Sequence, residues 1–205
     1  MTWAQWTPLA LVCLFGAMSP GPSLAVVTRH TISGGSGAGL VCAVSHGAGI
    51  LVWASLMVAG VGFLILEHSV WFTLIQVLGG LYLVYLGLKM LTSAKAPREA
   101  MNTGSTDSDG GAALDGLVIA LSNPKIAVFF AALFSQFIRP DAPWTEKVTL
   151  ALTAAVIDAL WYALVAVMLS RSMALEYLRE HTQLLNRIFG TILIVLAVSV
   201  MVSTG

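Results

Sequence analysis

Two charged side chains stand alone in long apolar stretches of the sequence and could form an ion pair inside a membrane. Lys125 is the only charged residue in the range 116–138, and Asp158 is the only one in the range 148–170. Charges are costly in hydrocarbon and usually mark the path of a substrate, an ion or a proton. The functional interpretation is a carboxylate that changes its protonation or its partner; the alternative is a static structural ion pair.

The composition places the chain in a lipid bilayer. Of its 205 residues, 58% are hydrophobic and 10% are charged, with a mean hydropathy of +0.88, whereas soluble domains carry about 25% charged residues. The formal net charge of zero argues against a nucleic-acid partner. No cluster of His, Cys and carboxylate residues indicates a metal, and we expect no cofactor. Residues 1–28 contain no Lys or Arg, which favours a retained helix over a signal peptide.

Six stretches with few charges are each near the ~20 residues that a helix needs to cross a bilayer. They are residues 6–28, 40–65, 70–90, 115–138, 148–170 and 185–204. The glycine-rich residues 33–37 predict the first loop. We expect an all-α integral membrane protein with one transmembrane domain, 1–205, divided into repeat 1 (about 1–92), a cytoplasmic linker (about 93–114) and repeat 2 (about 115–205).

The distribution of Lys and Arg predicts the orientation, because these residues favour cytoplasmic loops. Seven lie in or beside the first, third and fifth loops: Arg29, Lys89, Lys95, Arg98, Arg171, Arg179 and Arg187. Only Arg139 and Lys147 lie on the other side, so both termini are expected outside. At about 1.5 Å per residue, Lys125 and Asp158 then lie roughly 14 and 15 Å deep, near the midplane of a ~30 Å core.

The two halves share a short motif in the first helix of each, which predicts an inverted repeat. Residues 22–26 (Pro-Ser-Leu-Ala-Val) align with residues 124–128 (Pro-Lys-Ile-Ala-Val). Because each half has an odd number of helices, the second half must be inverted relative to the first. Inverted repeats with helices broken at matching positions indicate the binding site of a transporter. A simple proline kink in a packed helix is the alternative.

Both first helices are expected to be broken at these motifs. Pro20 and Pro22 donate no N–H, so the carbonyls of Gly16 and Met18 lose their helical partners, and Pro124 has the same effect in the second half. Freed carbonyls can hold an ammonium group, and a new helix N-terminus can hold a carboxylate. We therefore assign substrate binding to Ser19, Pro20, Gly21, Pro22, Ser23, Asn123, Pro124 and Lys125.

Other polar and aromatic residues of the spans have candidate roles. His46 could relay protons together with Asp158, since its unperturbed pKa is near 6.5; a buried neutral histidine bonded to a backbone carbonyl is the alternative. Gln136 could line the path or hydrogen-bond between helices. Trp53 and Trp161 could also line the path, with packing as the default interpretation. Small-residue faces permit a homodimer without requiring one.

The chain resembles the LysE/RhtB-type amino-acid exporters of bacteria over nearly its whole length. The motifs are Met18-Ser19-Pro20-Gly21-Pro22, residues 79–87, Leu121-Ser122-Asn123-Pro124-Lys125 with the phenylalanines that follow, and Asp158 before Trp161-Tyr162. The resemblance implies export of amino acids or close derivatives across the inner membrane in exchange for protons. Ser23 stands where many members have Asn or Asp, and His46 stands where an apolar residue is expected.

The resulting hypothesis is a secondary-active exporter and not an enzyme. No phosphate-binding loop motif for ATP is present. The substrate carboxylate would meet Lys125 and the N–H groups near Asn123, and the ammonium would meet carbonyls near residues 20–22 and Asp158. Because Asp158 is the only intramembrane acid, neutral side chains such as those of homoserine, threonine or leucine are expected. The alternatives are export of another small metabolite or ion, and an intramembrane hydrolase using Ser122 and Lys125.

Overall fold

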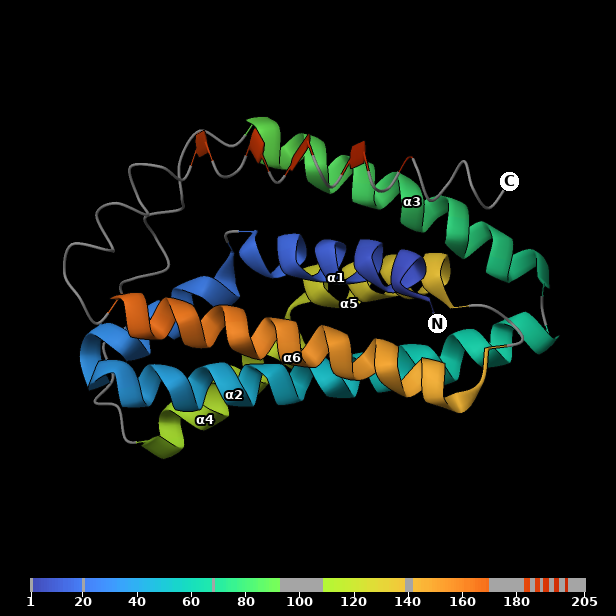
Figure 1. Ribbon diagram of the computed structural model, residues 1–205. Coiled ribbons are helices and arrows are strands. Elements are labelled where there is room, and N and C mark those ends of the chain that lie inside the picture. Colours follow the sequence, from blue (N-terminus) through green and yellow to red (C-terminus); the bar gives the residue numbers. More distant parts are fainter. Residues whose placement is uncertain are drawn as a thin grey trace.

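Figure 1 shows the computed structural model, which is helical throughout the core of the chain. The structure describes residues 2–19, 21–67, 69–92, 109–138 and 142–169, with separate residues between 183 and 198. Its helices are α1 (Trp3–Met18), α2 (Pro22–Glu67), α3 (Ser69–Thr92), α4 (Asp109–Ser122), α5 (Pro124–Phe137) and α6 (Trp144–Leu169). These described ranges contain no strand, so the all-α class expected from the sequence is confirmed.

The first predicted span is broken, as its prolines and glycine predicted. α1 begins after Thr2, whose backbone N–H donates to Gln5 Oε1 at 3.0 Å. It ends at Met18, and Ser19 is extended, with φ −64° and ψ 119°. α2 then starts at Pro22, where the missing N–H costs no helical hydrogen bond. Pro20 lies outside the described residues.

The predicted loop at residues 33–37 is a one-residue turn. α2 continues on both sides of Gly35, which alone has a non-helical backbone, with φ 78° and ψ −178°. A side chain is rarely tolerated in that conformation, which explains a glycine at this position. Figure 1 shows the chain folding back there, and a Cβ atom placed on Gly39 would meet Thr31 across the turn. The sequence therefore predicted the reversal correctly but placed too long a loop in it.

The fourth predicted span is also broken, at the matching motif of the second half. α4 ends at Ser122 and α5 starts at Pro124, and the two helices meet at a bend of 57°. Asn123 caps α5 by accepting a hydrogen bond from the Lys125 N–H through Oδ1 at 3.1 Å. α4 begins at Asp109, earlier than the predicted residue 115, so its first turn lies within the predicted linker.

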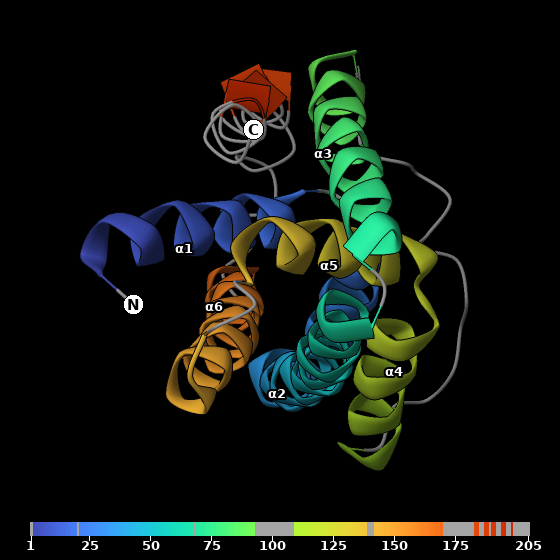
Figure 2. The same cartoon turned by 90° about the vertical axis from the view of Figure 1, so that its right-hand side faces the viewer.

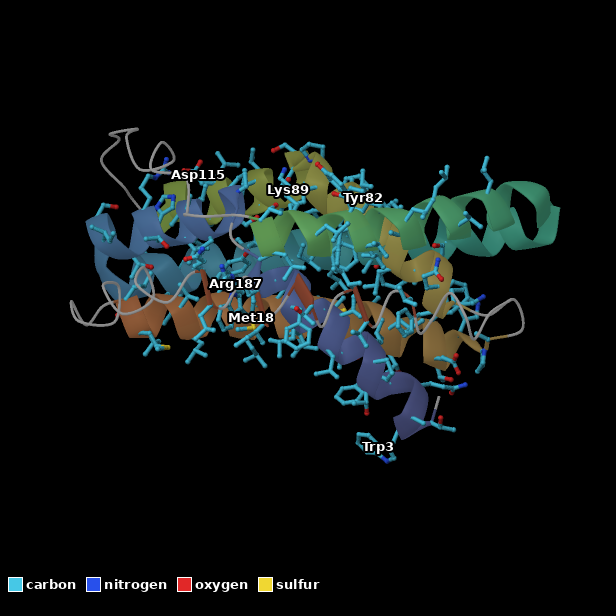
Figure 3. All side chains as sticks on the ribbon, turned by 90° about the horizontal axis from the view of Figure 1, so that it is seen from above. Trp3, Met18, Tyr82, Lys89, Asp115 and Arg187 are labelled. Atoms are coloured by element: carbon cyan, nitrogen blue, oxygen red, sulfur yellow. The ribbon has the colours of Figure 1, made fainter. Side chains whose placement is uncertain are left out.

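The helices pack around the hairpin that α2 forms. α2 lies along both α4 and α6, α3 lies along α5, and α1 packs on α6; Figure 2 shows α5 between α1 and α4 at one side of α2. The side chains of Leu9, Ile50, Phe134 and Leu150 fill the core between these helices, each at most 1% exposed. Figure 3 shows that α1 projects outward from the bundle, from Met18 at its inner end to Trp3 at its outer end.

The outer surface of the bundle is apolar. One face of α6 exposes a row of Val and Leu side chains at intervals of four residues, between 47% and 64% exposed: Val148, Leu152, Val156, Leu160 and Leu164. An uncharged helical stripe of this length is typical of a surface that faces lipid. The exposed surface of the fold is therefore suited to a membrane, in agreement with the apolar composition of the chain.

Two described helical segments are long and apolar enough to cross a membrane, namely Pro22–Gly60 and Trp144–Leu169. The bent pair Gly110–Ser122 and Pro124–Phe137 makes a third if it counts as one crossing. Within the predicted span 185–204, the separate residues that the structure describes are helical, and the others lie outside the described residues. The six-span topology and the inverted repeat stay predictions.

Candidate functional site

The two helix breaks lie against each other in the middle of the molecule. Lys125, in the first turn of α5, donates a hydrogen bond from Nζ to the Oγ atom of Ser19, the residue that ends α1, at 2.7 Å. A Cβ atom on Gly21 would lie 3.7 Å from the same Nζ atom. Two motifs that lie more than 100 residues apart in the sequence therefore meet at one point.

Asp158 of α6 has a histidine of α2 as its partner. Asp158 Oδ2 lies 2.6 Å from His46 Nδ1, and the two residues are 7% and 1% exposed. The Tyr162 ring stands edge-on to the His46 ring at 4.9 Å between centroids. Tyr162 also lies within hydrogen-bonding reach of Ser23 at the start of α2. A buried charge needs a partner of this kind. The contacts of this group join α6 to the two parts of α2 that lie on either side of Gly35.

One cavity contains both groups. Its polar lining includes Ser19, Ser23, His46, Asn123, Lys125, Asp158 and Tyr162, and its apolar lining includes Cys13, Ile50, Ile126, Phe129, Phe130 and Ala154. The empty space among these residues, including space that is open to the outside, is about 530 Å³. An ammonium group, a carboxylate and an aromatic wall together suit a ligand that is both zwitterionic and partly apolar.

The direct Lys125–Asp158 ion pair envisaged from the sequence does not form among the described residues. Lys125 instead binds Ser19, and Asp158 instead binds His46. Depth along the helices placed both charges near the same level, but the neighbours of each side chain depend on how the helices are rotated. As a result the cavity keeps a positive and a negative group that do not neutralise each other. Such a pair of separated charges is available to a ligand.

The backbone groups expected to bind substrate are partly occupied by the chain itself. The Lys125 N–H donates to the Asn123 side chain, and the Ile126 N–H donates to the Asn123 carbonyl at 3.0 Å. The Gly16 carbonyl, expected to be freed, accepts from the Ser19 N–H at 3.3 Å. The side chain of Lys125, rather than the amide groups beside it, is therefore the main positive group of the site.

The structure brings six of the eight predicted substrate-binding residues to the cavity. Ser19, Gly21, Pro22, Ser23, Asn123 and Lys125 line it. Pro124 is exposed at the start of α5 and does not line it, whereas Pro20 lies outside the described residues. The two predicted proton-coupling residues, His46 and Asp158, line the same cavity.

The three residues proposed to line the path lie away from this cavity. Trp53 donates from Nε1 to the Ala120 carbonyl at 3.1 Å and so joins α2 to α4. Gln136 is buried in α5 with Nε2 at 3.5 Å from Ser135 Oγ. Trp161 packs against the apolar cluster between α2 and α6. A role along a transport path stays a prediction for all three.

The geometry does not assemble the alternative Ser122–Lys125 hydrolytic dyad. The Ser122 hydroxyl is exposed and donates to the Val118 carbonyl at 2.7 Å, and the Lys125 ammonium faces Ser19 instead. Within the described ranges, no three His, Cys, Asp or Glu side chains gather in a way that could hold a metal ion. The described residues of the site therefore offer a ligand charged groups and an apolar wall.

Sequence reasoning missed several residues of the site. Tyr162 and Ile50 line the cavity and follow Asp158 and His46 by four residues, a spacing that places each pair on one helix face. That spacing could have indicated them. Phe129 was noted only as part of a motif, and nothing local to it indicated that its ring would reach the cavity.

A second polar cluster lies outside the cavity, between α2 and α4. Asp115 accepts a hydrogen bond from Arg29 and lies 3.0 Å from His30 Nε2. His30 is fully buried, whereas the Asp115 side chain is 41% exposed. Figure 3 shows Asp115 and Lys89 on the same half of the molecule. Arg29 and His30 thus fasten the first half of α2 to α4.

Comparison with known proteins gives a family and several curated relatives. The family model described as "LysE type translocator" matches residues 14–204. The threonine efflux protein of Escherichia coli (strain K12) is 31% identical over 77% of this chain and 78% of its own length. The leucine efflux protein of Salmonella choleraesuis (strain SC-B67) is 33% identical over 68% of this chain and 66% of its own. An uncharacterized membrane protein of Vibrio cholerae is 29% identical over 91% of both chains. No solved structure matches.

Proposed function

The chain belongs to the LysE type translocator family, and from this premise we propose that it exports amino acids with neutral side chains from the cytoplasm in exchange for protons. The observation that carries the proposal is the cavity between the two helix breaks, with Lys125 on one wall and the Asp158–His46 pair on another. An α-amino acid carries one carboxylate and one ammonium group, which match these two walls. The names of the threonine and leucine efflux relatives support the same substrate class.

The substrate carboxylate binds the Lys125 ammonium group. This group has three N–H donors, and its bond to Ser19 Oγ uses one of them. Lys125 also lies in the first turn of α5, where the helix dipole favours an anion. The carboxylate therefore approaches the break in the second half of the chain without displacing Ser19.

The substrate ammonium group binds the acidic wall. Asp158 is the only carboxylate that lines the cavity in the described part of the chain. If it takes the α-ammonium group, no acid is left in the cavity for a cationic side chain. Burying an unpaired cation is costly, so lysine and arginine are poor substrates and neutral side chains are preferred.

The Asp158–His46 pair couples export to the movement of protons. Both groups can exchange a proton, and they share a short contact of 2.6 Å beside the place where the ammonium binds. Protonation of this pair removes the negative charge that holds the substrate, and substrate binding in turn disfavours the proton. Antiport requires the proton and the amino acid to compete in this way, because each of them then favours a different state of the protein.

The protein lies in the inner membrane with both termini outside. Seven Lys and Arg residues lie in or beside the loops assigned to the cytoplasm and two lie on the other side, which supports this orientation. The substrate then enters the cavity from the side at which Arg29 and Asp115 meet.

The experiment that tests the proposal measures efflux from cells preloaded with amino acids by dipeptide feeding. Wild type is compared with Lys125→Ala and with an empty vector, at matched membrane levels. Lys147→Ala is the matched control, because it removes a lysine of α6 that packs on Trp144 outside the cavity. We expect wild type and Lys147→Ala to expel one or more neutral amino acids and Lys125→Ala to fail. Equal retention in wild-type and empty-vector cells would contradict amino-acid export and call for a wider metabolite panel.

A further inference from the structure

Part of the wall of the cavity is apolar and closely packed. Phe129 and Phe130 of α5, Ile50 of α2 and Ala154 of α6 form part of it, and each is at most 6% exposed. When the carboxylate and the ammonium of an amino acid are held by Lys125 and Asp158, its side chain is left to meet these groups. The size and polarity of this wall therefore decide which side chains fit.

Phe129 has a fixed position in this wall. Its ring lies directly over Gly16 of α1, so closely that a Cβ atom on Gly16 would overlap with the ring and come within 3.0 Å of Cε1. On its other side the ring meets Phe130 edge-on, with centroids 5.3 Å apart. Contacts on two sides keep the ring from swinging away to admit a larger ligand.

Several polar atoms of the cavity have partners within the protein. Ser19 binds Lys125, Ser23 lies within reach of Tyr162, and Asn123 caps α5. His46 Nε2 is buried and has no hydrogen-bond partner among the described residues. With Nδ1–H donating to the carboxylate of Asp158, Nε2 carries a lone pair and accepts a second N–H of the substrate ammonium.

From these contacts we infer that Phe129, held by Gly16, sets the upper limit on the size of the substrate side chain. This inference rests on the proposed function and names the residue that limits the substrate class within it. A side chain as bulky as that of phenylalanine meets the Phe129 ring.

The test is exchange transport by the purified full chain in liposomes. Alanine, threonine, leucine and phenylalanine are supplied separately at equal concentration, and initial rates are compared. We expect leucine to exceed phenylalanine by at least about tenfold, because the fixed ring of Phe129 leaves no room for the bulkier side chain. Phenylalanine moving as fast as leucine would overturn the inference. Absence of exchange for every amino acid would instead overturn the proposed function itself.

Two variants are expected to change the largest side chain that the site accepts, in opposite directions. Phe129→Ala removes the ring, and we expect the ratio of phenylalanine to leucine exchange to rise about tenfold. Gly16→Ala pushes the ring into the cavity, and we expect leucine to lose at least about tenfold relative to alanine. Phe134→Ala is the matched control, since it truncates a buried phenylalanine of the same helix that does not line the cavity.

The controls keep loss of folding apart from loss of selectivity. Each variant is compared by elution on a sizing column, and only ratios between substrates are interpreted. Where Phe129→Ala does not yield folded protein, Phe129→Leu makes the same change in a milder form. If the substrate ranking of the Phe129 variants equals that of wild type and Phe134→Ala, Phe129 does not set the limit and the inference is wrong.

Discussion

The Nζ atom of Lys125 donates a hydrogen bond to the Oγ atom of Ser19 at 2.7 Å, and this bond joins the break between α1 and α2 to the break between α4 and α5. Each break exists because a proline prevents the helix from continuing. Their meeting point holds the only lysine of the cavity lining that the structure describes. Changes to either residue therefore test how the two broken helices work together.

Replacing Ser19 with alanine removes the acceptor that positions Lys125. Hydrogen bonds to charged groups contribute about 1.5–3 kcal/mol, so we expect the substrate concentration at half-maximal efflux to rise about tenfold with a smaller change in maximal rate. Ser19→Thr keeps the hydroxyl and is expected to restore the wild-type value. The measurement is the concentration dependence of exchange in liposomes.

Ser135→Ala is the control for this change, because Ser135 is a buried serine of α5 that donates to the Ala132 carbonyl away from the cavity. If Ser19→Ala and Ser135→Ala behave alike, the bond to Lys125 has no part in substrate binding.

Replacing Asp158 with asparagine keeps the shape of the side chain but removes its ability to exchange a proton. At saturating substrate, we expect exchange of substrate for substrate to persist, while the acceleration produced by an imposed pH gradient falls by at least about tenfold, a coupling of ordinary size. Glu146→Gln makes the same change in the same helix outside the cavity and should keep the full response. A gradient that accelerates Asp158→Asn as much as wild type would remove Asp158 from the coupling mechanism.

Two substitutions of His46 separate its hydrogen bond from its proton. Asparagine places an amide N–H near the position of Nδ1 and so keeps a donor for Asp158, but it does not bind a proton at neutral pH. We therefore expect His46→Asn to retain exchange and to show a several-fold flatter dependence of efflux on pH, because the amide group neither takes up nor releases a proton.

His46→Leu removes both properties and leaves the Asp158 carboxylate without its 2.6 Å partner. We expect it to lose exchange as well, because the buried charge is then uncompensated. A pH profile of His46→Asn that superimposes on that of wild type would show that the histidine only orients Asp158.

Replacing Gly35 with alanine tests the turn in α2. A Cβ atom there meets nothing within 4 Å, so the whole effect comes from the backbone at φ 78° and ψ −178°. Residues forced into that region cost about 1–3 kcal/mol, and we expect a lower melting temperature in detergent. Gly37→Ala is the matched control, because its Cβ atom is equally free but its backbone is helical, where alanine is favoured by up to about 1 kcal/mol. Equal melting temperatures for the two variants would contradict the turn.

The sequence by itself determined the features that arise from local backbone chemistry and from composition. Prolines lack an N–H, so the proline motifs favoured helix ends near Met18 and Ser122, although α1 continues through Pro8. The low charge content requires a bilayer as solvent, and the glycines at residues 33–37 predicted a reversal of the chain. The position of that reversal, Gly35, could not be chosen from the sequence, because Gly34 and Gly37 are equally able to take a positive φ.

Only the tertiary structure decided which side chains meet. Counting residues placed Lys125 and Asp158 at a similar depth, but their partners depend on the rotation and tilt of helices that are distant in the sequence. Packing turned Lys125 toward Ser19 and Asp158 toward His46, and it brought the Phe129 ring over Gly16. Depth along a helix is set by the local rise per residue, whereas the direction of a side chain is set by every helix packed around it.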